Sequence, residues 1–284
     1  MDPALASILE HLLPFWLVAA RLSGLFLFAP VLASRLLMRQ FRVLLLVMLT
    51  VALYPAVVAA GIEMPPLEVG SVAMVLLAEV LIGLAIGMLV TLPLVAIQVA
   101  GSIISYKLGL ALAQVYNPEF DAQSEVIGQV LYLMGLAIYI QMDGLEHAVL
   151  AVMVTFESLP PGAAWLDVAP IQLMAAMTDA AFVVGMRIAM PALLMGTLVS
   201  LAMGVLMRTV PQINIMTIGF AIQIIMGLGV LVVAIFAIGD VVGESIVEAF
   251  DPIYDWARAI GDPATADAAA SGNWHAGEGV ADGR

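Results

Sequence analysis

Four charged side chains interrupt long apolar runs, and ionisable groups there are the first candidates for chemistry. They are Arg21, Glu79, Asp179 and Arg187. A charge at the centre of a bilayer is costly unless it is paired or hydrated, so such residues mark ion pairs or pathways for protons and ions. Asp179 and Arg187 are too far apart to pair on neighbouring helical turns. We consider a structural pair of Glu79 with Arg187, or a proton pathway, although no regular series of acidic or histidine positions supports the pathway.

Asp143, Glu146 and His147 form a second polar group and resemble part of a metal site. A helix that begins just after a turn explains the two acids better, because carboxylates there meet the positive end of the helix dipole. His11 and His275 stand in unrelated contexts. We therefore expect no metal site.

Signatures of enzymes and of nucleic-acid binding are absent from the sequence. It has no H-E-x-x-H, no G-x-S-x-G and no glycine-rich phosphate loop with its lysine. Cysteine is absent, and the nine Lys and Arg residues form no basic patch beyond the group Arg35, Arg39 and Arg42. We expect no catalysis, no cofactor and no nucleic-acid partner.

The composition places the chain in a membrane. Its 284 residues are 63% hydrophobic and 11% charged, whereas soluble domains have about 25% charged residues. Long apolar runs between turn signals predict an all-α integral membrane protein rather than a β-barrel. The N-terminus lacks a basic stretch before its first apolar run, so we expect no cleaved signal peptide. The cluster at residues 35–42 predicts a cytoplasmic loop.

Six apolar runs are candidate spans: Leu12–Ala33, Val43–Ala60, Val69–Ile104, Val126–Phe156, Ile171–Met207 and Ile215–Gly239. A bilayer needs about 20 helical residues, so the third and fifth runs are too long. They tilt, break at Pro93 and Pro191, or continue outside the lipid against other protein. In the fourth run Asp143-Gly144 predicts the turn of a helical hairpin. We expect one helical membrane domain over residues 1–260 and a disordered tail rich in Ala, Gly and Asp over residues 261–284.

Small residues recur at helical spacing in two of these runs. Gly83 and Gly87 form one pair, and the other set is Ala192, Gly196, Ser200 and Gly204. Such stripes let another backbone approach closely. They predict packing either within the chain or against another subunit, and the spacing does not choose between the two.

The stretch RTVPQIN is unusually polar for its place between two apolar runs. Arg208 suits a helix C-terminus and Pro211 suits the start of the next helix, so we expect a hairpin tip here. Gln212 and Asn214 are not needed for a turn, and they predict a polar contact at that tip.

This stretch, followed by an apolar segment with Gly219-Phe220, resembles the FliR family of type III secretion export-gate proteins. Further landmarks occur in the family's order: LIGLAIGMLV at 81–90, GLALAQVYNP at 109–118, the Asp143-Gly144 turn and TFESLPPG at 155–162. The resemblance covers roughly residues 12–250, and PQINIMTIGF at 211–220 is also similar to the turn of the two-helix FliQ subunit. Leu145, Ala221 and Gln223 depart from the family's usual residues, so no role is carried over to them.

The resemblance implies a non-enzymatic, cone-shaped gate in the bacterial inner membrane, at the flagellar basal body, that stands partly outside the bilayer plane. It implies FliP-like, FliQ-like and FlhB-like partner subunits and unfolded export substrates. By position, the plug of the closed pore falls on Gly109, Leu110, Ala111, Leu112, Ala113, Gln114, Val115, Tyr116, Asn117 and Pro118. A polytopic small-molecule transporter, the homologous injectisome subunit and an assembly scaffold are the alternatives.

Overall fold

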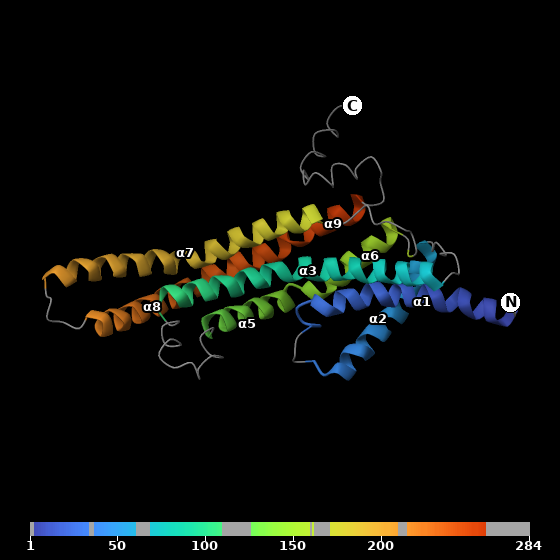
Figure 1. Cartoon of the computed structure of the whole chain (residues 1–284), viewed down its shortest axis with the longest axis horizontal. Coiled ribbons are helices and arrows are strands. Elements are labelled where there is room, and N and C mark those ends of the chain that lie inside the picture. Colours follow the sequence, from blue (N-terminus) through green and yellow to red (C-terminus); the bar gives the residue numbers. More distant parts are fainter. Residues whose placement is uncertain are drawn as a thin grey trace, which may run out of the picture. The chain divides into compact units, whose positions relative to one another are not determined.

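A computed structural model of the chain describes residues 3–33, 37–60, 69–109, 126–159, 161, 171–209 and 215–259. Helices dominate these ranges and no strand occurs in them (Figure 1). The helices are α1 (Pro3–Phe28), α2 (Arg39–Ala60), α3 (Val69–Lys107), α5 (Val126–Gln141), α6 (Gly144–Ser158), α7 (Ile171–Thr209), α8 (Ile215–Glu248) and α9 (Phe250–Ala259). The predicted tail, 261–284, lies outside the described residues.

The helices have the length and composition of membrane spans. Within the described ranges, four helical segments are long and apolar enough to cross a bilayer: Arg39–Ala59, Gly70–Lys107, Leu173–Leu206 and Ala221–Arg258. The number rises to five if the bent pair of α5 and α6 counts as one span. The prediction of an all-α integral membrane protein is confirmed, and each of the six apolar runs coincides with one or two helices.

Of the three alternatives for the overlong third and fifth runs, the structure excludes breaks at Pro93 and Pro191. Both α3 and α7 continue through their internal proline and reach 39 residues each. An internal proline removes one backbone hydrogen bond, and packed membrane helices tolerate this because neighbouring groups adjust around the freed carbonyl. The third and fifth apolar runs are therefore single long helices.

The chain does break at Asp143, as the sequence predicted, but it does not form a hairpin there. Asp143 has a left-handed backbone with φ of 53°, a conformation that Asp tolerates better than most side chains do. Helices α5 and α6 are bent by 64° at this point, whereas the legs of a hairpin would run antiparallel. This feature is a sharply bent helix pair.

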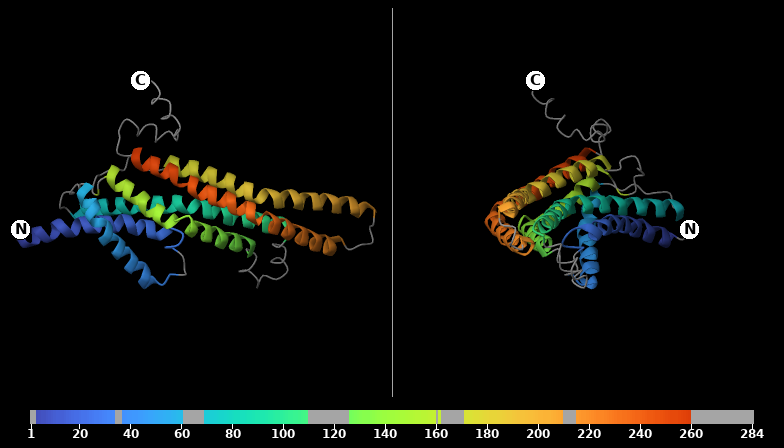
Figure 2. Two further views of the ribbon diagram at one scale, coloured as in Figure 1. Left: turned by 180° about the vertical axis from the view of Figure 1, so that it is seen from behind. Right: turned by 60° about the vertical axis from the view of Figure 1, so that its left-hand side comes forward.

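Contacts within the chain divide it into two compact units that share α3, α7 and α8. The first unit comprises residues 1–92, 143–178 and 247–284. In it α1 packs on α2, and α6 packs on α9 (Figures 1 and 2). Its core contains fully buried side chains from three helices, among them Leu17, Ile86 and Phe156.

The second unit comprises residues 93–142 and 179–246. It consists of the end of α3, α5 and most of α7 and α8, which run lengthwise along one another in both figures. Small residues let the backbones touch: a Cβ added at Gly185 of α7 would lie 3.0 Å from the carbonyl oxygen of Ala96 on α3. The single domain expected over residues 1–260 stays a prediction.

Candidate functional site

The predicted plug segment begins where α3 ends. Leu108 Nα donates to the carbonyl oxygen of Ile104 at 2.9 Å, and Gly109 Nα donates to that of Tyr106 at 3.1 Å. Gly109 then takes φ of 78°, the left-handed position at which glycine ends a helix without a steric penalty. Gly109 is the only predicted plug residue within the described ranges, and residues 110–118 lie outside them.

The predicted hairpin tip is described only at its first residue. Arg208 is exposed in the last turn of α7, where a cation meets the negative end of the helix dipole. Pro211, Gln212 and Asn214 lie outside the described residues, and α8 begins directly after them at Ile215.

Gly83 and Gly87 lie against α1 of the same chain. A Cβ added at Gly83 would overlap the carbonyl oxygen of Arg21, and one at Gly87 would lie 3.0 Å from that of Leu25. Gly24 on α1 faces α3 in turn, because a Cβ added there would overlap the backbone of Val80. At these glycines, α1 and α3 approach each other more closely than any larger side chain would permit.

The stripe on α7 splits into a covered part and an open part. A Cβ added at Gly196 would lie 2.8 Å from Cγ of Lys107 on α3. Ser200 turns its hydroxyl back onto its own helix and donates to the carbonyl oxygen of Gly196 at 2.7 Å. Among the described residues, no atom lies within 4 Å of a Cβ added at Gly204. The described residues therefore leave space beside Gly204.

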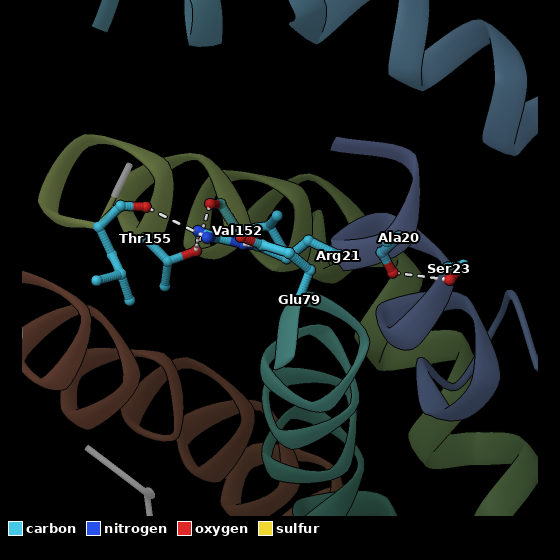
Figure 3. A network of polar contacts seen from close by, with 7 residues as sticks. Ala20, Arg21, Ser23, Glu79, Val152 and Thr155 are labelled. Atoms are coloured by element: carbon cyan, nitrogen blue, oxygen red, sulfur yellow. Dashed lines mark hydrogen bonds and ion pairs between the residues drawn. The ribbon is translucent and has the colours of Figure 1, made fainter. Parts of the chain in front are cut away.

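Two of the four intramembrane charges form a buried ion pair (Figure 3). Nε of Arg21 on α1 donates to Oε2 of Glu79 on α3 at 2.6 Å. The exposed fractions of the two side chains are 0% and 2%. Removing one partner of such a pair leaves a buried charge uncompensated, at a cost of about 3–5 kcal/mol.

The guanidinium of Arg21 also binds the end of α6. Nη1 donates to Oγ1 of Thr155 and Nη2 donates to the carbonyl oxygen of Leu159, both at 3.2 Å. The guanidinium carbon lies 4.1 Å from the centroid of the Phe156 ring, within cation–π range. Arg21 thus joins α1, α3 and α6 in one network.

The sequence did not identify the members of this network correctly. Glu79 pairs with Arg21, so the proposed pair of Glu79 with Arg187 is wrong. Asp179 and Arg187 are exposed on α7. Thr155 and Phe156 were missed as partners of Arg21, although both stand in the motif TFESLPPG and a hydroxyl beside an aromatic ring was the available signal.

Asp143, Glu146 and His147 surround the start of α6. Asp143 precedes the helix without a side-chain capping bond, and Glu146 lies in its first turn. Nδ1 of His147 lies 3.0 Å from the hydroxyl of Tyr254 on α9, and that hydroxyl is 3.1 Å from the carbonyl oxygen of His147. The group contributes to the packing of α6 on α9, and in the described part of the chain no cluster of three possible metal ligands occurs.

The sequence matches the family model described as bacterial export proteins, family 1, over residues 12–249. Similar curated proteins include the flagellar biosynthetic protein FliR of Bacillus subtilis (strain 168), which is 28% identical over 241 residues that cover 83% of this chain and 91% of that protein.

FliR of Caulobacter vibrioides is 26% identical over 236 residues, which cover 83% of this chain and 93% of that protein. FliR of Escherichia coli (strain K12) is 25% identical over 217 residues, which cover 76% and 82%. The family match spans nearly all of the helices whose geometry is described above. The chain therefore belongs to the bacterial export proteins, family 1, the family of the FliR proteins.

Proposed function

We propose that this chain is a non-enzymatic subunit of the flagellar type III protein export gate, in the inner membrane at the flagellar basal body. The family match over residues 12–249 carries this proposal. The similar proteins named above have flagellar names, which favours the flagellar export system over the homologous virulence injectisome.

Helix length supports a gate that stands partly outside the bilayer. Helices α3 and α7 have 39 residues each. At 1.5 Å per residue each is about 58 Å long, whereas the hydrocarbon core is about 30 Å thick. Both helices therefore either extend beyond the hydrocarbon core or tilt steeply within it. Other protein subunits would cover the apolar side chains of the parts that extend beyond the hydrocarbon.

Exposed apolar side chains on α7 and α8 support an assembly with other subunits. Phe236 on α8 is 83% exposed, and Phe182 and Leu201 on α7 are also exposed. Arg187 is exposed on α7, and a charged side chain that faces only lipid has a high free-energy cost. FliP-like, FliQ-like and FlhB-like subunits, together with membrane lipid, are the proposed neighbours.

The pore plug is proposed for residues 109–118. Residues 109–113 are too apolar for an ordinary exposed loop and too few to span a membrane. Gly109 supplies the turn out of α3. In a channel wide enough for an unfolded polypeptide, an apolar segment prevents ion leakage by excluding water.

A small-molecule transporter is disfavoured by the course of α3 and α7. Many transporters form their binding sites at helices that are broken near the middle of the membrane, and Pro93 and Pro191 are the positions at which α3 and α7 could break. Both helices are continuous through these prolines.

Copurification tests the assignment. The full chain with an affinity tag should isolate FliP-like and FliQ-like subunits from membranes in one complex. A strain that lacks the chain should lose secretion of flagellar proteins, and expression of the tagged chain should restore it. A folded monomer that isolates neither subunit, in cells whose flagellar secretion does not depend on the chain, would contradict the proposal.

A further inference from the structure

The first half of α2 is largely uncovered by the described part of the chain. None of residues 39–49 is buried, whereas Thr50, Leu53 and Val57 in the second half are. The first half also diverges from α1 in both views of Figures 1 and 2. Its exposed apolar side chains are Phe41, Val43, Leu44, Leu45, Val47 and Met48. A helix that is apolar on nearly all sides needs an apolar environment, which lipid or another protein has to supply.

The residue types of α2 favour lipid over another helix. The closest helix contacts in this chain are made at glycines: Gly24 and Gly83 join α1 to α3, and Gly101 meets Gly128 of α5. Such small residues mark helix interfaces in membranes. Helix α2 contains no glycine, and its exposed side chains are long or branched. Its 22 residues make it about 33 Å long, close to the thickness of the hydrocarbon core. Fluid acyl chains therefore suit this helix.

Two arginines stand on one face at the start of α2. Arg39 is exposed and Arg42 is partly exposed. Spacings of three and four residues place them on the same face as Leu46 and Leu49, which are partly exposed as well. The same face carries Leu53 farther along, where the chain buries it. Between residues 39 and 49, this face therefore presents cations at its end and apolar side chains beside them.

The stability of α2 does not explain these cations. A cation in the first turn of a helix meets the positive end of the helix dipole, which is unfavourable, and the first turn of α2 contains no acid. Arg35, Arg39 and Arg42 are three of only nine Lys and Arg residues in a chain of net charge −13, and Arg35 lies outside the described residues. A basic patch at the end of an apolar span attracts the phosphates of anionic lipids.

We propose that the first half of α2 binds an anionic phospholipid. Arg39 and Arg42 bind the phosphate of the headgroup, for which the fork of a guanidinium is well suited. An acyl chain of the same lipid lies along Leu46 and Leu49. The lipid covers the apolar face that the described residues leave open, and it holds the start of α2 at the membrane boundary. The site lies entirely within this chain, so the inference does not depend on the proposed gate function.

Lipid binding to the full chain, purified with the subunits that accompany it, tests the headgroup contact. Native mass spectrometry compares titrations with phosphatidylglycerol and with phosphatidylcholine. Arg39→Gln should weaken the tightest binding of phosphatidylglycerol about fivefold, and Arg39→Gln with Arg42→Gln about 25-fold, because each arginine near an anionic lipid surface contributes about 1 kcal/mol. Arg258→Gln removes an exposed arginine from α9 and should bind as wild type does.

Photocrosslinking shows where the lipid lies. A phosphatidylglycerol probe with a diazirine in its acyl chain should label residues 41–51 of the wild-type chain. A phosphatidylcholine probe with the same acyl chain should label them less. The variant that lacks both arginines should lose the preference for phosphatidylglycerol while the amount of inserted chain stays the same.

Three results would overturn the proposal. Equal labelling of wild type by both probes would show contact with lipid but no recognition of the headgroup. Absence of label from α2 would show that a protein subunit covers this helix instead. Unchanged binding of phosphatidylglycerol to the double variant would show that the two arginines do not hold the phosphate.

Discussion

At the scale of single residues, the buried charge of Arg21 is accounted for by its partners. The guanidinium binds the Glu79 carboxylate, the Thr155 hydroxyl and the Leu159 carbonyl, and it lies over the Phe156 ring. These four partners lie on α3 and at the end of α6, so the guanidinium is suited to holding α1, α3 and α6 together. The network therefore favours structural pairing over a proton pathway at these residues.

Substitution of Glu79 by Ala should destabilise the chain by about 3–5 kcal/mol, because it leaves Arg21 buried without its counter-ion. The level of folded chain in membranes and its thermal unfolding measure the effect. Asp179→Ala removes an exposed acid and should change stability by less than about 0.5 kcal/mol. Equal effects of the two substitutions would refute the structural role of the pair.

The sequence could identify these charges but not their partners. Arg21, Glu79, Asp179 and Arg187 stood out because ionisable groups are rare in apolar runs. Which of them meet depends on how α1, α3 and α6 pack, and Arg21 and Thr155 are separated by 134 positions. Gln223 was noted only as a departure from the family. Its side chain donates to the carbonyl oxygen of Lys107, and this contact likewise depends on the packing of α8 against α3.

At the scale of elements, glycines set how closely α1 and α3 approach. Gly24 on α1 faces the backbone of Val80 and Leu84, and Gly83 on α3 faces the backbone of Arg21. The contact is reciprocal, so each helix has a glycine where the other needs room. This close approach brings the side chains of Arg21 and Glu79 into the same buried space.

Gly83→Ala should force α1 and α3 apart and destabilise the chain by about 1–3 kcal/mol, the usual cost of overpacking. Gly70→Ala is the matched control in the same helix, because no atom of the described residues lies within 4 Å of a Cβ added there. Protease resistance of the membrane-inserted chain compares the two. If Gly83→Ala resists proteolysis as well as Gly70→Ala does, the contact between α1 and α3 is looser than described.

Helix positions were largely predictable because each apolar run of sufficient length forms helix. The run Val69–Ile104 became α3 over Val69–Lys107, and the run Ile171–Met207 became α7 over Ile171–Thr209. The sequence could not decide whether α3 and α7 break at their prolines, and they do not, because the cost of one missing hydrogen bond is small beside the packing of a long apolar helix. The bend at Asp143 was placed correctly, but its angle follows from tertiary packing.

At the scale of the whole molecule, α7 and α8 present apolar surface that the described residues of the chain do not cover. Val233 and Phe236 on α8 and Val205 on α7 are strongly exposed. Within the described part of the chain, no atom lies within 4 Å of a Cβ added at Gly204 or Gly229. Lipid can cover apolar side chains, but close approach at a glycine is a feature of helix–helix contacts.

Gly204→Leu should lower the yield of the complex with FliP-like and FliQ-like subunits without lowering the amount of inserted chain. No described atom of the chain lies beside an added Cβ at this position, but a leucine side chain would obstruct a neighbouring helix. Gly70→Leu fills another open position, at the start of α3, and serves as the control. Wild-type yield of the complex from Gly204→Leu would show that no subunit packs there.

The most direct test of the export-gate account is the resting ion conductance of the assembled complex after deletion of residues 109–116. Conductance across planar bilayers is compared for the wild-type complex and for a deletion complex that contains the same subunits in the same ratio. If these residues plug the channel, the deletion should raise resting conductance and make cells that express it sensitive to salt. Unchanged conductance in a correctly assembled deletion complex would contradict the account.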